Sequence, residues 1–399
     1  MSSATASHPA PRRRPRDRKR LIEEAAASAF AERGYHGVSM QDIATAVGIS
    51  APALYRHFPN KYALFTQTVF ALAHSLVEAT DDVADDPQTP EDARAVLESL
   101  LDVVIATTID LRATGGIYRW EGRYLERDDR DRLTAEFRIL RGRFERAHAI
   151  YRPELSEVDR STVVLGALSA VASVTAHRTT VAVRTLRTQL AGAAWRALDA
   201  SIAPDDDDTL LPTVVRDTSH RRDLLLEAAI DQFAVHGYND ATIEDIAAAA
   251  DLTPSGVYRH FEGKGEMLLA VSERAALELE RATRDARTGA ASPREAMQRL
   301  CVAYVAHTFG NLPLMRVYFA DLANLPPDQQ RRLRAMQRAH IAAWVSLLQG
   351  ARPELGQREA AVLVHAGLSV VADQAPLVMP TRSVVRRLAG LVEAVLGVA

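Results

Sequence analysis

Cysteine and long uncharged stretches are scarce in this 399-residue chain, and each scarcity excludes a class of protein. The single cysteine, Cys301, excludes an internal disulfide and a site built from several thiolates, and it fits a reducing compartment. The longest stretch without a charged residue, 161–177, has 17 residues, fewer than the roughly 20 that cross a bilayer. With 47% hydrophobic residues the composition is that of a globular protein. We therefore expect a cytoplasmic protein without a membrane partner.

The net charge of −3 conceals one strongly basic stretch near the N-terminus. Residues 12–20 (RRRPRDRKR) hold seven basic residues and one acidic residue. Such a local concentration of charge predicts contact with a polyanion. The residues that follow, Leu21 to Glu24, include two acids and no apolar run, so the stretch does not have the form of a secretory signal. Residues 1–16 are predicted to form a disordered basic arm.

The chain contains two copies of one sequence unit. The stretch 18–61 aligns without a gap to 221–264, with 18 identities in 44 positions, including the tetrapeptide YRHF at 55–58 and 258–261. Farther on, RPEL at 152–155 returns at 352–355. The period of about 200 residues is too long for a solenoid, so it indicates a duplicated domain. The acidic residues 204–217 are predicted to be the linker between the copies.

Every long pattern in both copies is helical. Ile22, Ala26 and Phe30 lie on one apolar stripe of a first helix, and Gly34 stands where a left-handed residue would end it. Ser39 and Asp42 then have the spacing of a capping box that begins a second helix at residues 40–47. The second copy repeats these features, and no alternating pattern long enough for a strand is present. The predicted fold class is all-α.

The short helix at 40–47, the turn at Gly48 and a further short helix at about 51–57 have the spacing of a helix-turn-helix, whose second helix enters the major groove of DNA. Polar residues on and after the second helix favour this interpretation over plain three-helix packing. Tyr55, Arg56, His57 and Lys61 lie outside the apolar stripe, where they can donate to phosphates.

Residues 34–61 (GYHGVSMQDIATAVGISAPALYRHFPNK) resemble the DNA-binding signature of the tetracycline-repressor (TetR) family, and the second copy resembles it too. The resemblance implies two nine-helix units, each with an N-terminal three-helix DNA-binding domain (17–60 and 218–263) and a helical ligand-binding and dimerisation domain (61–203 and 264–399). It also implies dimerisation through a four-helix bundle formed by the last two helices of each unit. Members of the family are mostly bacterial repressors.

The resemblance assigns roles to matching residues. Ser39 and Thr242 match a cap that also contacts phosphate, and Tyr55, His57 and Lys61, with their counterparts in copy two, match phosphate contacts. A buried aromatic packing role is the alternative for Tyr55 and Tyr258, and Phe58 and Phe261 are expected in the core. The expected DNA contacts are Arg12, Arg13, Arg14, Arg16, Arg18, Lys19, Ser39, Gln41, Ser50, Ala51, Pro52, Ala53, Tyr55, Arg56, His57 and Lys61, and Arg221, Arg222, Thr242, Glu244, Thr253, Pro254, Ser255, Gly256, Tyr258, Arg259, His260 and Lys264.

Neither recognition helix begins with a residue that reads a purine by a bidentate contact. Residues 51–53 are Ala-Pro-Ala and residues 254–256 are Pro-Ser-Gly. Readout is therefore expected to depend on thymine methyl groups, on Gln41 or Glu244, and on DNA shape. Copy two also has Asp251 in place of the turn glycine and several acids around the motif, so we expect it to bind DNA more weakly than copy one.

Duplication suggests that a single chain does the work of a dimer. The last two helices of each copy, expected near 157–180 with 185–202 and 357–375 with 382–397, are rich in Ala, Val, Leu and Gly and can pack closely. Folded together they would form an intramolecular pseudo-dimer, a monomer that binds an imperfect palindrome. The alternative is a homodimer of tandem chains with four DNA-binding domains.

The remaining expectations concern ligands and rival functions. The candidate effector-binding residues are Tyr118, Trp120, Glu121, Tyr124 and His177; the first four mix aromatic and charged groups as ligand sites do. The alternatives are a half-exposed helix with many ion pairs at 118–130 and, for His177, a core histidine with satisfied hydrogen bonds. No nucleophile with a partner base, metal cluster or phosphate loop is recognisable, so we expect no enzyme activity, no cofactor and no metal. The predicted function is a ligand-responsive repressor with a double-stranded DNA operator as partner; the alternative is a helical scaffold in which one or both motifs no longer read DNA.

Overall fold

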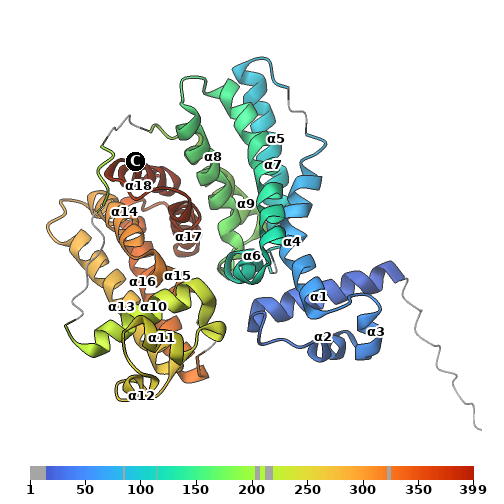
Figure 1. The fold of residues 1–399 in the computed structure, drawn as a ribbon. Helices are drawn as coiled ribbons and strands as arrows, with labels where there is room; N and C mark the ends of the chain where they lie inside the picture. The colour runs from blue at the N-terminus through green and yellow to red at the C-terminus, as the bar shows by residue number, and fades with distance from the viewer. Residues whose placement is uncertain (1–14, 84–85, 114, 203–206, 212–218, 321–324) are drawn as a thin grey trace, which may run out of the picture.

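The computed structural model describes residues 15–83, 86–113, 115–202, 207–211, 219–320 and 325–399, except for the side chains at 15–17, 120 and 319–320. Within these ranges the chain is helical and has no strand; its only β-type pairing there is an isolated bridge between Leu210 and Thr381. The described part holds two units of nine α-helices each, which confirms the predicted fold class (Figure 1).

Unit one comprises residues 15–202. Its first three helices form head one (residues 15–60), and the other six form the body of the unit. Predicted local signals act as expected: Ser39 caps α2, Gly48 ends it in the left-handed conformation, and Ser50 caps α3. The helices are α1 (Pro15–Arg33), α2 (Met40–Val47), α3 (Ala51–Tyr55), α4 (Lys61–Ala79), α5 (Pro90–Asp110), α6 (Ile117–Glu121), the 3₁₀ turn η1 (Gly122–Tyr124), α7 (Arg127–Tyr151), α8 (Glu157–Ala172), η2 (Ser173–Thr175) and α9 (Val183–Leu198).

Unit two comprises residues 219–399 and repeats this order, with head two at residues 219–263. Gly237, with a φ of 80°, kinks the chain near the end of α10, and Asp251, with a φ of 53°, takes the left-handed turn that Gly48 takes in unit one. The helices are α10 (Arg221–Asp240), α11 (Ile243–Ala249), α12 (Pro254–Val257), α13 (Lys264–Arg287), α14 (Pro293–Gly310), α15 (Leu312–Ala320), α16 (Pro327–Ala351), α17 (Gln357–Gln374), η4 (Ala375–Leu377) and α18 (Arg382–Leu396).

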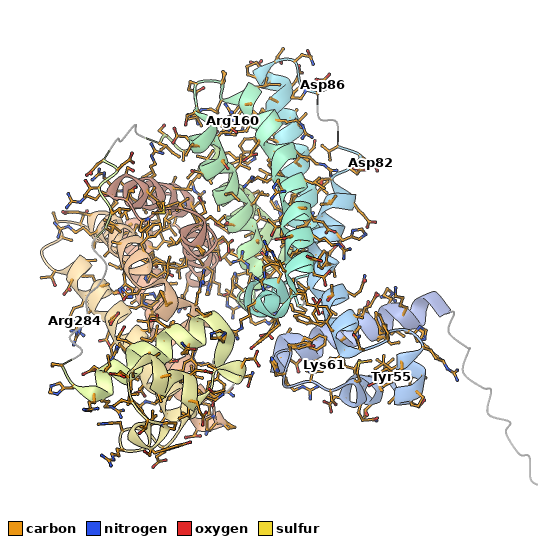
Figure 2. The ribbon with its side chains drawn as sticks, viewed as in Figure 1. Tyr55, Lys61, Asp82, Asp86, Arg160 and Arg284 are labelled. Carbon is orange, nitrogen blue, oxygen red and sulfur yellow. The ribbon has the colours of Figure 1, made fainter. Side chains whose placement is uncertain are left out.

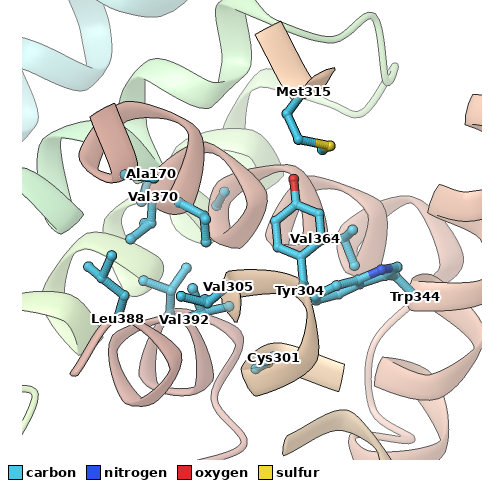
Figure 3. Close-up of a cluster of buried hydrophobic side chains, with 14 of the residues drawn as sticks. Ala170, Cys301, Tyr304, Val305, Met315, Trp344, Val364, Val370, Leu388 and Val392 are labelled. Carbon is cyan, nitrogen blue, oxygen red and sulfur yellow. The ribbon is translucent and has the colours of Figure 1, made fainter. Parts of the chain in front are cut away.

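The last two helices of each unit pack together in one four-helix bundle. Helix α17 contacts both α8 and α9, and α18 contacts α9. Gly166 on α8 allows the approach, because a Cβ there would lie 2.7 Å from the side chain of Leu391 on α18. Figure 3 shows Ala170 of α8 beside Val370 of α17, within a core that runs on into unit two. The bundle is therefore an interface between units inside a single chain.

The same bundle explains the two most apolar helices of the chain. Residues 157–175 and 357–377 are long and apolar enough to cross a membrane by length and composition. More than half of each segment is buried inside the protein, where their apolar faces pack in the bundle. Their hydropathy is thus accounted for by packing between units.

Polar contacts fasten the bundle at its ends and along its sides. Arg196 of unit one donates to the carbonyl oxygens of Ala394 and Val395 at the C-terminus of α18, with an Nη2–O distance of 2.7 Å to Val395. A cation at this position satisfies carbonyls that the helix leaves unpaired and complements the helix dipole. Arg387 of α18 pairs with Asp159 of α8 at 3.4 Å. These contacts fix the register of the two units.

Two predicted boundary segments differ from expectation. Helix α1 begins at Pro15, so the end of the predicted arm (1–16) is helical. Proline is favoured in the first turn of a helix. The ion pairs Lys19–Glu23 and Arg20–Glu24, at i,i+4 spacing, stabilise the next turn. Residues 1–14 lie outside the described residues. In the predicted linker (204–217), the described residues 207–211 are not a free acidic stretch. They lie against the N-terminus of α18, where the Ser383 N–H donates to the carbonyl oxygen of Asp207 at 3.0 Å.

Candidate nucleic-acid interface

Both heads lie at the lower end of the molecule in Figure 1, on the same side of the bundle. In head one the capping box brings Ser39 to the surface: its Oγ accepts from the Asp42 N–H at 3.1 Å and donates to the Asp42 carboxylate at 2.7 Å. The Ser39 N–H also donates to the Asp42 carboxylate, at 2.8 Å, and this bond, followed by the one from Ser39 Oγ, lowers the pKa of Asp42. Ser39, Gln41, Tyr55 and Lys61 line one open hollow of about 590 Å³. Four of the predicted contact residues thus share one surface.

The end of each recognition helix presents an exposed tyrosine and an exposed arginine. Tyr55 is 50% exposed and Tyr258 is 59% exposed, so the alternative of a buried aromatic packing role is wrong for both (Figure 2 shows Tyr55). The side chains of Arg56 and Arg259 are exposed as well and make no hydrogen bond or ion pair within the described part of the chain. Phe58 and Phe261 are buried, as predicted. His57 and His260, the remaining histidines of the motif, are half-buried.

The lysine that follows each motif, the first residue of α4 or α13, donates to carbonyl oxygens of the adjoining head instead of extending to solvent. Lys61 Nζ donates to the carbonyl oxygen of Val38 at 2.9 Å and lies over the ring of Tyr35. Lys264 Nζ donates to three carbonyl oxygens, those of residues 238, 239 and 241, and so uses all its donors. Partial burial lowers the pKa of both lysines. This placement argues against Lys264 as a phosphate contact, because the loop carbonyls before α11 compete for the ammonium.

Head two is acidic where head one is basic. Residues 18–61 hold six basic and four acidic side chains, whereas the matching residues 221–264 hold four basic and eight acidic side chains. The Arg222 side chain already has partners within the chain: it donates to the His260 carbonyl oxygen at 2.6 Å, lies over the ring of Phe261 and pairs with Glu266 at 3.6 Å. Only part of the basic charge of head two is therefore available to a polyanion.

The remaining predicted DNA contacts lie at the starts of the recognition helices, in the basic arm and at other positions of the two heads. Ser50 and Thr253 act as N-caps, accepting from the N–H groups of Ala53 and Gly256, and both are exposed. Arg12, Arg13 and Arg14, with the side chain of Arg16, lie outside the described residues. The other predicted contacts are exposed or half-buried: Arg18, Lys19, Ala51, Pro52, Ala53, Arg221, Thr242, Glu244, Pro254 and Ser255.

A cavity of about 800 Å³ lies at the body of unit one, and only one of the predicted ligand residues with described side chains lines it. Tyr118 lines it, and its ring packs on Phe137. Glu121 does not: its carboxylate accepts from the Tyr35 N–H at 2.7 Å. Tyr124 stacks on Tyr35 at a centroid distance of 5.8 Å. Glu121, at the end of α6, and Tyr124, in η1, thus join the body to head one. The side chain of Trp120 lies outside the described residues.

His177, the last predicted ligand residue, is buried between the units. Its ring stacks on His365 of α17, with centroids 4.2 Å apart and planes 12° apart. Burial, His365 and Arg112 lower the pKa of His177 to about 2. Burial and Arg112 lower the pKa of His365 to about 4. Both rings are therefore neutral at pH 7 and act as part of the interface rather than as cavity wall.

Sequence reasoning missed the contribution of unit two to this region. Arg119 of α6 forms a bidentate ion pair with Asp373 of α17, with N–O distances of 2.7 and 2.8 Å. Asp373, Arg316 and the α10 residue Val235 line the cavity of unit one. No spacing in the sequence relates residues this far apart, because the pairing depends on how the units dock. Among the described residues no group of three or more metal-binding side chains is present.

Comparison with known proteins identifies both heads. Residues 22–68 and 225–271 each match the domain described as "Bacterial regulatory proteins, tetR family". The HTH-type transcriptional activator FasR of Mycolicibacterium smegmatis is 34% identical over 97 residues, 23% of this chain and 43% of that protein. A probable acrEF/envCD operon repressor of Escherichia coli K12 is 48% identical over 46 residues, 12% of this chain and 21% of that protein. The chain thus spans less than half the length of these relatives.

Solved structures resemble one unit at a time. The ketosteroid transcriptional regulator KstR2 of Mycobacterium tuberculosis is 22% identical with a TM-score of 0.41, over 46% of this chain and 97% of that chain. A TetR-family regulator, PfmR, of Thermus thermophilus is 25% identical with a TM-score of 0.40, over 45% of this chain and 96% of that chain. From the two domain matches we conclude that both heads belong to the tetR family of bacterial regulatory proteins, in a chain that carries the nine-helix unit containing such a head twice in tandem.

Proposed function

We propose that this protein is a cytoplasmic, ligand-responsive transcriptional repressor that binds an imperfect palindromic operator with both heads of one chain. The observation that carries the proposal is the four-helix bundle between α8, α9, α17 and α18. It joins the units with both heads at one end of the molecule. A palindromic duplex has two half-sites related by a two-fold axis and separated by the helical repeat of DNA. Binding both half-sites therefore requires two DNA-binding heads in a two-fold related arrangement.

The functional particle of this proposal is a monomer. The apolar faces of α8 and α17 are already buried against each other, with Val163, Ala167, Val364 and Val370 fully inaccessible to solvent. A second chain would have to displace this interface before it could use the same faces. The DNA-free protein should therefore have a mass near 43.6 kDa in solution.

The two heads contribute unequally to affinity in this proposal. Head one offers Arg56 and Tyr55 together with the basic residues of α1, whereas head two carries an excess of acidic side chains. Because phosphate neutralisation dominates duplex affinity, head one should supply most of the salt-dependent binding. The acidic surface of head two also favours a second candidate, a scaffold role in which head two does not contact DNA.

An effector in the cavity of unit one has a short physical route to head one. Tyr118 lines the cavity, while Glu121 and Tyr124, three and six residues later, contact Tyr35 of head one. A ligand that displaces Tyr118 must move this segment, since α6 and η1 are continuous in the chain. The proposed response is loss of the head spacing that suits the operator.

Selection of binding sites from a random duplex library, followed by fluorescence anisotropy, tests the proposal. Arg56→Gln and Arg259→Gln form a matched pair, because the two arginines occupy the same repeat position and are both exposed. We expect Arg56→Gln to weaken duplex binding by about three- to tenfold and to reduce the log–log salt slope by about 1. Arg259→Gln should change affinity by less than about twofold.

Three results would contradict this scheme. Absence of duplex binding that survives nonspecific competitor would favour the scaffold candidate for both heads. An equal effect of the two arginine variants would contradict unequal heads. A stable particle of about twice 43.6 kDa in light scattering would contradict the monomer and favour a homodimer of tandem chains.

A further inference from the structure

The cavity of unit one is built by both units, and one of its walls belongs to head two. Leu72, Val104 and Leu140 represent the apolar wall from unit one. Unit two adds Val235 from α10, the first helix of head two, and Leu377 from η4. These two side chains are 71% and 66% exposed, which is unusual for large apolar residues beside a cavity. An apolar ligand would cover them and so touch both units at once.

The charged residues of the cavity wall are mostly cationic. Arg123, Arg130 and Arg141 come from unit one and Arg316 from unit two, whereas the one carboxylate is that of Asp373. The Asp373 carboxylate is already neutralised by the bidentate contact with Arg119. Arg316 makes no hydrogen bond or ion pair within the described part of the chain. Arg141 pairs with Glu145 at 3.3 Å and Arg130 donates to the carbonyl oxygens of residues 123 and 125. Among the described residues, the uncompensated positive charge beside the apolar surface is therefore that of Arg316.

The corresponding place in unit two has a different chemistry. Helices α5 and α14 both begin with proline, and aligning them at that residue makes His307 the equivalent of Val104. Helices α7 and α16 have the same length, and their register pairs Leu140 with His340. Apolar wall positions of unit one are thus polar in unit two. Trp344, the counterpart of Phe144, is buried there with its ring edge against Tyr304. The two units do not offer the same site.

We propose that the cavity of unit one takes one amphipathic anion per chain, with its apolar body against both units and its anionic group at Arg316. This inference rests on the proposed effector role of the cavity and names the class of ligand. Because Val235 belongs to head two, the occupant contacts the second DNA-binding head directly, in addition to the α6 segment that holds head one.

A matched pair of fluorescent probes tests the proposal on the full chain without DNA. 8-Anilinonaphthalene-1-sulfonate carries an anionic sulfonate, and N-phenyl-1-naphthylamine has the same ring system without it. We expect one high-affinity sulfonate site per chain. Arg316→Gln should weaken sulfonate binding about tenfold, as expected for loss of a hydrogen-bonded charge, and leave binding of the neutral probe unchanged. Arg358→Gln, an exposed arginine at the start of α17, is the control and should alter neither probe.

The wall from unit two is tested separately. Val235→Asp places a carboxylate at an exposed position, so folding should be retained, and it should weaken binding of both probes by disrupting the apolar surface and repelling the sulfonate. Unchanged sulfonate affinity in Arg316→Gln, an equal loss of both probes in that variant, or two equivalent sites per chain would overturn the proposal. Duplex affinity of Arg316→Gln without probe should equal that of the unmodified protein. Absence of duplex binding by the unmodified protein, together with the expected probe binding in all variants, would count against the DNA-binding proposal alone.

Discussion

The ion pair between Arg119 and Asp373 offers a quantitative test of how the units are joined. The Arg119 side chain is 6% exposed and that of Asp373 is 28% exposed, and their two N–O contacts are 2.7 and 2.8 Å. Asp373→Asn keeps the shape but removes the charge, and leaves a guanidinium buried between α6 and α17. Removing one partner of a buried pair costs about 3–5 kcal/mol. Partial exposure of Asp373 reduces this, so we expect a loss of about 2–3 kcal/mol in the free energy of unfolding.

Urea unfolding followed by tryptophan fluorescence measures this loss, because the buried Trp344 reports on unit two and Trp195 on the bundle helix α9. The control is Glu280→Gln, which breaks an exposed pair with Arg284 at 2.7 Å. Exposed pairs contribute little, so the control should lose less than about 0.5 kcal/mol. An Asp373→Asn loss no larger than the control would refute the reasoning.

Replacing both Arg119 and Asp373 by apolar residues distinguishes the contribution of the ion pair from that of side-chain packing. In the double variant Arg119→Met with Asp373→Leu, no charge remains buried between the units. Such replacements are often neutral or stabilising, so the double variant should recover most of the lost stability. A double variant less stable than Asp373→Asn would show that the side chains act through shape or through Tyr118, which accepts a hydrogen bond from Arg119 at 3.1 Å.

Two further predictions concern the bundle. The stacked rings of His177 and His365 have pKa values lowered to about 2 and about 4, so the unfolded chain binds protons first as pH falls below about 6.5. Stability should therefore decrease from pH 6.5 toward pH 4, by about 4 kcal/mol for the pair at pH 5, and a calorimetric pH series should lose that dependence when both are replaced by Gln. Gly166→Val should lower the free energy of unfolding by about 2–3 kcal/mol, because its side chain must displace the buried Leu391. Gly390→Ala, which meets no neighbour within 4 Å, should instead be neutral or slightly stabilising, and equal effects of the two glycine changes in urea unfolding would contradict close packing at residue 166.

Local features of the heads could be predicted from the sequence because they depend on neighbouring residues. The Ser39–Asp42 capping box, the left-handed Gly48 and the strained Asp251 all occur where the spacing placed them. Helix ends follow from hydrogen bonds within a few residues, so one sequence contains the necessary information. The exposure of Tyr55 does not follow from the sequence, since an aromatic residue at that position fits either a surface or a core. The number of helices in each unit was implied by the resemblance to the TetR family, and the repeat indicated that the second unit has the same order as the first.

The sequence alone therefore determined two helical units, their caps and their helix-turn-helix surfaces. Only the tertiary structure decided which faces meet between the units: Arg119 with Asp373, His177 with His365, and Val235 beside the cavity of unit one. It also decided that Lys264 is bound to loop carbonyls of head two. The physical reason is that helix periodicity gives the direction of each side chain on its own helix, whereas contacts between distant helices depend on how whole apolar faces dock.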